Sequence, residues 1–300
     1  MKRVLITGGA GFIGSHLARA WVARGAEVHV LDSLRTGFAA NLDGVGCHFH
    51  QGSVEDKALV ARLCAGVDVI HHMAALVSVP ESMEKPEVTE SINVLGTLNV
   101  LEGARAAGVS KVVFSSTSAV YGMVERPVHS ETDLPDPVSP YAITKLAAEH
   151  YMGLYARSFG VPTMCLRYFN VYGPRQDPKS PYAAAVAIFT DRARAHAPIT
   201  IFGDGEQTRD FVFVDDVVAA NLLAAEKGSG VANVACGGRI TITDLARQII
   251  AQTGSRSAIE FKPPRAGDVK HSRGASERLR ALGWEPRVPL EEGLRRTFAG

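Results

Sequence analysis

Residues 4–20 read VLITGGAGFIGSHLARA and place four glycines between an apolar run and an amphipathic stretch. The apolar run 4–6 has the composition of a buried strand, and residues 15–25 have the period of a helix. Gly8, Gly11 and Gly14 lie between them. In this position the glycines predict a dinucleotide-binding loop, because positions without side chains let the backbone and the helix N-terminus approach a pyrophosphate. A tight turn without a ligand is the alternative at this point.

The alternation of strand and helix patterns continues to residue 168. Apolar, β-branched runs occupy 27–31, 47–51, 67–72, 111–116 and 162–168, and amphipathic stretches occupy 15–25, 54–64 and 88–108. Near-continuous apolar strands separated by helices predict a parallel sheet that is covered on both faces. Together with the glycine loop, the pattern predicts an α/β fold of the Rossmann type, a doubly wound parallel sheet.

The pattern changes after residue 170. A loop rich in proline at 173–181 precedes an apolar helix (182–197), a strand (198–203) and a further helix (214–228). Prolines recur toward the C-terminus, which indicates short elements. We therefore expect a nucleotide-binding domain of residues 1–170 plus about 210–235, and a smaller C-terminal substrate-binding domain of residues 171–209 and 236–300.

The composition argues against several classes of function. The chain has 300 residues, of which 46% are hydrophobic, and a formal net charge of +1. This balance argues against a nucleic-acid or membrane partner held by bulk charge. The four cysteines lie far apart, and the N-terminal apolar run is interrupted at Thr7-Gly8-Gly9. We therefore expect free thiols, no signal peptide and a cytoplasmic protein.

Polar residues end two of the predicted strands. A carboxylate at Asp32 can accept hydrogen bonds from an adenosine ribose and would repel a 2′-phosphate, which predicts NAD over NADP; Arg35 would soften this preference. His71 and His72 could suggest a metal site. We read no second pair at a suitable spacing, so we expect them to support the cofactor pocket and expect no metal.

Tyr141 and Lys145 lie four residues apart in a predicted helix and therefore on one face of it. An unperturbed tyrosine has a pKa of about 10. The Lys145 ammonium, together with the positive charge of an oxidised nicotinamide, is expected to lower that pKa and to make the phenol a general base. Taken alone, such a pair is more often a surface pair. Here it follows a strand that ends in small hydroxyl residues at 115–118, where a parallel sheet faces its ligand.

Many segments together resemble one known family. They are TGGAGFIG (7–14), LD (31–32), HHMAA (71–75), NVLGTLNVLEGA (93–104), SSTSAVYG (115–122), YAITK (141–145), RYFNVYGPRQ (167–176), SPYAAAVAIF (180–189), GDGEQTRDFVFVDDV (203–217) and RAGDVKHS (265–272). In this order they resemble the extended short-chain dehydrogenases/reductases and, within that group, the UDP-glucose/UDP-N-acetylglucosamine 4-epimerases. The resemblance covers nearly the whole chain.

The resemblance implies roles for individual residues. Tyr141 would be the catalytic base and acid, Lys145 would hold the nicotinamide ribose and lower the tyrosine pKa, and Thr117 would hydrogen-bond the reacting hydroxyl. A register shift of that role to Ser116 or Ser118 stays open. NAD would contact Tyr141, Lys145 and also Gly8, Gly11, Phe12, Ile13, Gly14, Asp32, Ser33, Ser53, Val54, Met73, Ala74, Ala75, Asn93, Ser115 and Tyr168. The nucleotide sugar would contact Ser118, Asn170, Ala184, Val186, Phe202, Arg209, Arg265, Asp268 and Ser272.

Several of these contacts have plain structural alternatives. Arg209 and Arg265 would clamp the diphosphate, for which a planar guanidinium is suited. Arg209 could instead form a surface ion pair, Asn170 could satisfy local backbone groups, and Asp268 could be a turn residue. Phe169 would lie near the nicotinamide, and Asp268 would reach the uridine ribose.

The implied reaction is NAD-dependent 4-epimerisation of a UDP-sugar through a transient 4-keto intermediate. Ser118-Ala119 stand where a dehydratase of the family has an acidic pair, which favours epimerisation. A small residue at Ser272 would admit both hexoses and N-acetylhexosamines.

Other readings stay open. A UDP-glucuronate 4-epimerase or another nucleotide-sugar dehydratase or decarboxylase is the alternative, and an inactive NAD-binding regulator is a weaker one. The chain departs from the family at Ser53 and in HSRGAS (271–276). The family also implies a homodimer, packed through residues 88–107 and 141–159.

Overall fold

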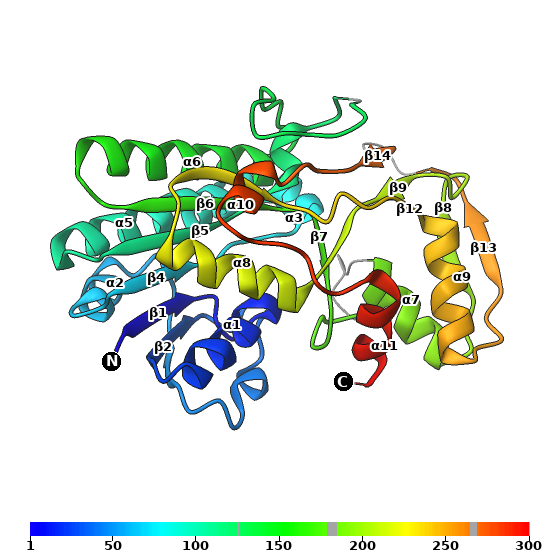
Figure 1. Ribbon diagram of the computed structural model, residues 1–300, viewed down its shortest axis with the longest axis horizontal. Helices are drawn as coiled ribbons and strands as arrows, with labels where there is room; N and C mark the ends of the chain where they lie inside the picture. Colours follow the sequence, from blue (N-terminus) through cyan, green and yellow to red (C-terminus); the bar gives the residue numbers. More distant parts are fainter. Residues whose placement is uncertain (125, 179–184, 265–268, 300) are drawn as a thin grey trace.

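The computed structural model describes residues 1–124, 126–178, 185–264 and 269–299. Its main element is a seven-stranded sheet in which every pair of neighbouring strands is parallel (Figure 1). In spatial order the strands are β11 (Gly230–Val234), β6 (Thr163–Tyr168), β5 (Lys111–Thr117), β4 (Val69–His72), β1 (Arg3–Thr7), β2 (Glu27–Asp32) and β3 (His48–Gln51). This order confirms the predicted doubly wound Rossmann fold.

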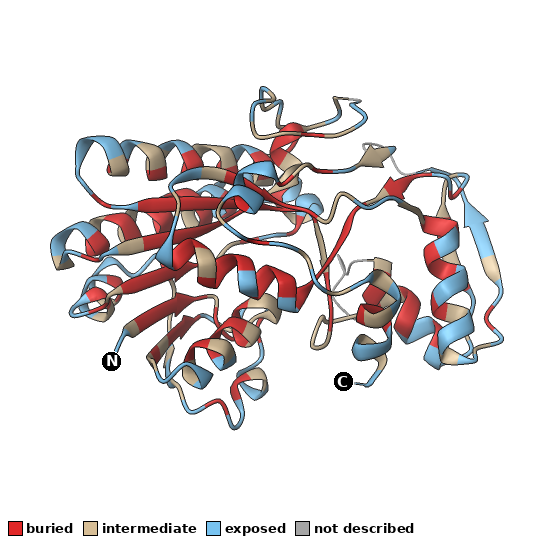
Figure 2. Cartoon of the chain, in the orientation of Figure 1, coloured by how far each residue is buried: buried red, intermediate tan, exposed pale blue. Residues whose placement is uncertain are grey.

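Helices cover both faces of the sheet. α1 (Phe12–Ala23) and α8 (Val214–Glu226) pack on one face, and α2 (Lys57–Cys64), α5 (Gly96–Ala107) and α6 (Pro140–Ser158) pack on the other. Successive strand residues point to opposite faces. Val4 and Ile6 therefore lie in the core with α1 and α8, whereas Leu5 lies in the core with the other three helices. Burial on both faces explains why the inner strands β1, β4, β5 and β6 are largely apolar (Figure 2). The edge strand β3 is mostly exposed.

The helix that we predicted over residues 88–108 is interrupted. A short helix α3 (Val79–Glu84) leads to α4 (Pro86–Glu90), and a π-helical turn, Ser91–Leu95, then joins α4 to α5. The apolar periodicity did not reveal this turn, because a single wide turn leaves the pattern on both sides helical. π turns are frequent at functional sites, and this one carries Asn93.

A smaller lobe lies beside the large sheet, on the right in Figure 1. It contains α7 (Ala185–Arg194), α9 (Ile242–Thr253), α11 (Leu290–Ala299) and the parallel pair of β8 (Ile199–Phe202) and β13 (Ile259–Lys262). Its own core includes Phe189, Ile201, Leu245 and Leu294. We expected only short elements toward the C-terminus, but α9 and α11 have 12 and 10 residues.

Very short strands lie between the large sheet and the smaller lobe. β7 (Asn170–Tyr172) pairs with β10 (Phe211–Phe213), and β9 (Thr208–Arg209) lies between β12 (Ile240–Thr241) and β14 (His271–Ser272). The helix α10 (Glu277–Ala281) follows β14. The chain reaches α8 and β11 of the large sheet only after it has formed β8 to β10.

Two general features complete the fold. Among the described residues, no helix has the length and apolar content that a bilayer crossing requires. Cys47, Cys64, Cys165 and Cys236 are all free thiols, and Cys64 and Cys165 are buried. Burial raises the pKa of Cys64 to about 12, which makes it an inert core residue.

Candidate functional site

The glycine loop fits between β1, β4 and α1 because it lacks side chains. Gly8 has a φ of +70°, and a Cβ there would lie 2.7 Å from the backbone nitrogen of Ala74. A Cβ on Gly14 would lie 2.3 Å from the carbonyl oxygen of Gly8. Gly11 is the N-cap of α1. The loop therefore brings main-chain N–H groups to the helix N-terminus, the arrangement that binds phosphate. Phe12 and Ile13, in the first turn of α1, pack against the core of the smaller lobe.

Asp32 holds the loop from the end of β2. One of its carboxylate oxygens accepts from the Ala10 nitrogen at 2.9 Å and the other accepts from the Leu34 nitrogen at 2.8 Å. A carboxylate oxygen has two lone pairs, so these bonds leave capacity for a ribose. Ser33 is exposed beside it. Arg35, which we expected to soften the preference for NAD, donates to Glu81 at 2.6 Å.

A buried polar chain supports the loop after β4. The Thr7 hydroxyl lies 2.8 Å from Nδ1 of His72, and Nε2 of His72 lies 2.9 Å from the Thr97 hydroxyl. Backbone nitrogens of Met73 and Ala74 each donate to the Thr7 hydroxyl at 3.2 Å. This loop, which also includes Ala75, is thereby fixed against β1.

His71 and His72 point to opposite faces of the sheet. Nε2 of His71 accepts from the Trp21 indole on the α1 side, whereas His72 faces Thr97 on α5. Burial lowers the pKa of both imidazoles to about 3. The two residues cannot share a metal ion, and their role as support for the cofactor pocket remains the simpler reading.

Asn93 ties the π turn to two neighbouring elements. Its Oδ1 accepts from the Leu76 nitrogen at 2.8 Å, and its Nδ2 donates to the Leu76 carbonyl at 3.1 Å and to the Thr144 hydroxyl at 2.9 Å. The residue is buried. Its side chain thus positions the loop after β4 and the start of α6.

In the segment after β3, Ser53 and Val54 make contacts within the protein. The Ser53 hydroxyl donates to the Glu55 carboxylate at 3.0 Å and accepts from the Glu55 nitrogen at 3.1 Å. Val54 is buried against Gly96, where an added Cβ would come within 2.5 Å of its side chain. Their contact with an adenine stays a prediction.

Tyr141 lies in the first turn of α6, which Ser139 caps by accepting from the Ala142 nitrogen. The Thr117 side chain, at the end of β5, lies close enough to the Tyr141 phenol to favour its ionised form. The burial of the phenol outweighs this effect and raises the pKa of Tyr141 above its ordinary value.

Lys145 lies one turn further along α6 and is buried. Its Nζ donates to the Ser115 carbonyl at 2.8 Å and lies 4.8 Å from the centre of the Phe114 ring. Burial lowers the pKa of Lys145 to about 7. In the protein chain by itself the ammonium is directed at the Ser115 carbonyl and does not contribute to the pKa shift of Tyr141, so its effect together with bound NAD stays a prediction.

The register at the end of β5 favours Thr117 over Ser116. The Ser116 hydroxyl donates to Glu149 at 2.5 Å, on the opposite side of the strand from the Ser115 hydroxyl. Glu149 in turn forms a two-bond ion pair with Arg167, at 2.8 and 2.6 Å. Both side chains of the pair are buried. Ser118, partly exposed, begins the 3₁₀ turn Ser118–Tyr121.

Tyr168, the last residue of β6, and Phe169, which follows it, both contact other parts of the protein. The Tyr168 hydroxyl lies 3.0 Å from the Ser115 hydroxyl and also bonds Asn221 of α8. Phe169 is 5% exposed and packs against Tyr121. A direct contact of Phe169 with a nicotinamide would need that ring to leave the core.

Asn170 bonds the main chain of a distant segment and not of its own turn, and its contact with a nucleotide sugar stays a prediction. Its Nδ2 donates to the Asp210 carbonyl at 3.1 Å. The Asp210 carboxylate accepts from the nitrogens of Cys236, Gly237 and Gly274. Burial raises the pKa of Asp210 to about 6. Asp210 therefore links β9 and β10 to the C-terminal segment, a role that its place beside Arg209 did not reveal.

Arg209 and Ser272 lie next to each other, as partners in the pairing of β9 with β14. One Arg209 nitrogen, Nη1, donates to the Thr208 carbonyl at 2.9 Å. Arg209 also lines a pocket of about 490 Å³ in the smaller lobe together with Arg239 and Arg287. The lining of this pocket is separate from the Tyr141 site at the end of the large sheet.

The other predicted substrate residues are distributed between core and surface. Val186 is fully buried in the core of the smaller lobe, so its side chain is a packing residue, and Phe202 ends β8 and is partly exposed. Ala184, Arg265 and Asp268 lie outside the described residues.

The fold, the glycine loop and the Tyr141–Lys145 pair define a nucleotide-binding α/β protein with a tyrosine at the carboxyl end of its central strand. Residues 4–236 match the NAD dependent epimerase/dehydratase family. The chain belongs to this family and is an enzyme that uses NAD.

Individual proteins resemble it along nearly their full length. UDP-glucose 4-epimerase of Mycolicibacterium smegmatis is 41% identical over 98% of this chain and 97% of its own. The structure of UDP-glucose 4-epimerase with UDP-glucose from Thermotoga maritima superposes with a TM-score of 0.96 and 42% identity, over 99% of this chain and 97% of that one. The UDP-N-acetylglucosamine 4-epimerase of Methanobrevibacter ruminantium M1, in complex with UDP-N-acetylmuramic acid, has a TM-score of 0.95 and 36% identity over 99% and 97%.

Proposed function

We propose that this enzyme catalyses the NAD-dependent 4-epimerisation of a UDP-sugar. The observation that carries the proposal is the placement of the Tyr141 phenol beside Thr117 at the end of β5, with Lys145 one turn along the same helix. These groups lie at the carboxyl end of β5, the edge at which open α/β sheets bind ligands. The similar UDP-glucose and UDP-N-acetylglucosamine 4-epimerases support the same reaction.

The side chains of the enzyme would bind and orient the substrate and would move a proton. Tyr141 would take the proton of the carbon-4 hydroxyl and later return it, and Thr117 would hold that hydroxyl in line with the phenol. Bound NAD would supply the acceptor and donor of hydride, and its oxidised form carries a positive charge. The sugar is expected to pass through a 4-keto form and to turn over in the site while its nucleotide stays bound.

A further positive charge is required at Tyr141. Burial raises the pKa of the phenol, and Lys145 is directed at the Ser115 carbonyl. We therefore infer that the phenol becomes a base near neutral pH only in the cofactor complex. Lys145 carries three N–H donors when protonated, so its bond to Ser115 leaves donors for a nicotinamide ribose.

Tyr141→Phe tests the catalytic assignment. The phenylalanine keeps the ring and removes the proton carrier, so we expect turnover to fall by about 10²- to 10⁴-fold with the fold intact. Tyr151→Phe, on the same helix, is the matched control and should retain turnover. Wild-type turnover in Tyr141→Phe would contradict the proposal. Bound NAD without turnover of any UDP-sugar by the wild-type enzyme would support an inactive regulator instead.

The sugar is expected to be a hexose, an N-acetylhexosamine or both. Ser272 is small and lies beside Arg209 on the paired strands β14 and β9, and we infer that Arg209 binds the diphosphate next to it. Turnover of UDP-glucose, UDP-N-acetylglucosamine and UDP-glucuronate, measured side by side, tests this inference. Preferred turnover of UDP-glucuronate would favour the uronate 4-epimerase alternative, and loss of water from the sugar would favour a dehydratase.

We also propose that the enzyme is a cytoplasmic homodimer. Val88, Leu95, Ile143 and Leu154 are exposed apolar residues on α4, the π turn and α6. Such residues on neighbouring helices suit a helical interface between two copies. The molar mass in solution tests this: a monomer at micromolar concentration would contradict the proposal.

A further inference from the structure

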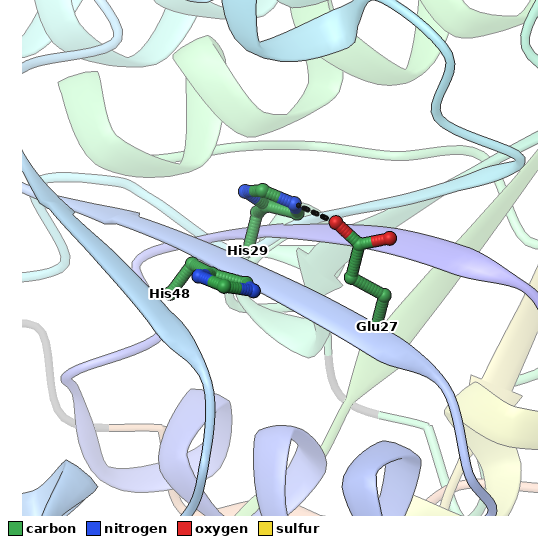
Figure 3. Close-up of side chains that lie close together, drawn as sticks. All are labelled: Glu27, His29 and His48. Atoms are coloured by element: carbon green, nitrogen blue, oxygen red, sulfur yellow. Dashed lines mark hydrogen bonds and ion pairs between the residues drawn. The ribbon is translucent and has the colours of Figure 1, made fainter.

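Four side chains on β2 and β3 gather on one face of the large sheet, away from the site described above. Glu27 and His29 alternate along β2, and His48 and His50 alternate along β3. The two strands are parallel, with His29 directly opposite His48. Residues two apart on a strand share a face, so Glu27 and His29 of β2 meet His48 and His50 of β3. Figure 3 shows Glu27, His29 and His48 on the two strands.

Potential ligand atoms of Glu27, His29 and His48 all lie within 4.8 Å of one another. Nε2 of His29 lies 3.0 Å from Oε1 of Glu27. The rings of His29 and His48 are stacked with their centres 4.8 Å apart. Two ligands of a tetrahedral zinc ion, each about 2.0–2.1 Å from the metal, lie about 3.3 Å apart. The His29–Glu27 separation is close to that value, and the ring of His48 would have to turn out of its stacked position to complete the set.

His50 supplies the second feature of a histidine-based metal site. Its Nε2 lies 3.0 Å from Nδ1 of His29, the nitrogen that faces away from Glu27. A metal-bound histidine usually donates its other N–H to an acceptor, which fixes the ring and the tautomer. The Nε2 atom of His50 is placed to accept that bond from Nδ1 of His29.

One charged neighbour competes with a cation for Glu27. Arg3 on β1 is 2.9 Å from Oε1 of the same carboxylate. Arg3 is 40% exposed and can turn toward water, so an ion can take its place at low energetic cost.

We propose that Glu27, His29 and His48 form a binding site for one divalent transition-metal ion of the zinc class, with His50 as the hydrogen-bond partner of His29. Imidazole nitrogen and carboxylate oxygen are ligands that Zn²⁺ accepts. His48 is exposed, which gives an ion access and leaves the fourth position for water. The ion would join β3, the edge strand of the large sheet, to β2.

Titration of the chelator-treated, full-length enzyme with Zn²⁺ by isothermal calorimetry tests the proposal. We expect one Zn²⁺ per chain, at least about tenfold weaker binding in His48→Ala and Glu27→Gln, and a loss of about 10- to 100-fold in His50→Ala. His150→Ala removes an exposed histidine from α6 and should bind Zn²⁺ as the wild type does. Saturating Zn²⁺ should raise the melting temperature of the wild type and not that of His48→Ala.

The result that overturns the proposal is either no saturable, stoichiometric Zn²⁺ binding by the wild type or equal affinity in wild type and His48→Ala. His48 is exposed, so its removal should leave the metal-free melting temperature and the turnover unchanged. If His48→Ala has a lower melting temperature than the wild type without metal, the Zn²⁺ affinity of Glu27→Gln is compared with that of the wild type instead. The glutamine amide keeps the shape of the side chain and removes its charge.

Discussion

Two regions of this enzyme are built in different ways: the predicted cofactor side, around the glycine loop, and the predicted substrate side, on the short strands β7, β9 and β14. On the cofactor side, buried polar side chains such as Asp32 and Asn93 bond the main chain and hold a glycine loop in place. On the substrate side, Asn170, Arg209 and Ser272 project from strands of two or three residues. Where buried polar side chains hold the main chain, the loss of one of them disturbs the whole loop. A side chain on a short strand can be replaced without moving the main chain. Changes on the first side should therefore affect stability or every substrate, and changes on the second side should affect selectivity.

The largest expected effect comes from the ion pair behind β5. Glu149→Ala leaves the buried Arg167 guanidinium without its carboxylate and should lower the free energy of unfolding by about 3–5 kcal/mol. Glu226→Ala removes one partner of the exposed Arg24 pair and should cost less than about 1 kcal/mol. Urea denaturation measures both. Equal losses in the two variants would remove the contrast between buried frame and exposed surface.

Lys145 should make the stability of the cofactor-free enzyme depend on pH. Burial lowers its pKa in the folded protein from 10.5 to about 7. Between these values the unfolded chain binds a proton that the folded chain has released, so folding becomes more favourable as pH rises. The Lys145 contribution is most unfavourable below about pH 7 and disappears near 10.5.

Lys145→Met isolates this contribution. The free energy of unfolding of the wild type minus that of the variant should rise with pH across this window, by up to about 1.4 kcal/mol per pH unit. Urea denaturation from about pH 6 to about pH 10 measures it. Lys57→Met, at an exposed position, should show no such slope. A pH-independent difference for Lys145→Met would mean that its ammonium is solvated in the folded state.

The smallest expected effect lies on the substrate side. Ser272→Tyr places a large ring beside Arg209 and should lower kcat/KM for UDP-N-acetylglucosamine about tenfold or more, with little change for UDP-glucose. Ser272→Ala, which keeps the position small, should leave both substrates unchanged. Loss of both activities in Ser272→Tyr would show that this position belongs to the frame and not to the selectivity of the site.

The sequence predicts the large sheet well for a physical reason. The inner strands β1, β4 and β5 are buried on both faces and are therefore largely apolar, and each is followed by a segment that forms a helix. The strands of the substrate side have two or three residues, too few for any period to develop. The π turn at Ser91–Leu95 is hidden for a related reason, since both flanking helices keep their pattern.

The candidate site is only partly visible in the sequence. Spacing places Tyr141 and Lys145 on one helical face, but it does not show that Lys145 is directed at Ser115 or that burial raises the pKa of Tyr141. The Glu149–Arg167 pair joins α6 to β6, so only the fold brings it together. The expectation of no metal site rests on His71 and His72, for which we read no second pair at a suitable spacing. The E-x-H and H-x-H pattern at 27–29 and 48–50 was the signal for the further site.

The position of β11 has a consequence for biosynthesis. This outermost strand beside β6 and the helix α8 come from residues 214–234, after the polypeptide has left for the smaller lobe and returned. A nascent chain that has emerged only as far as Tyr168 presents β6 as an open edge and an uncovered apolar surface. Such intermediates associate readily with one another. Translation of this enzyme therefore passes through a stage at which the half-finished sheet is open to such association until residues 214–234 have followed.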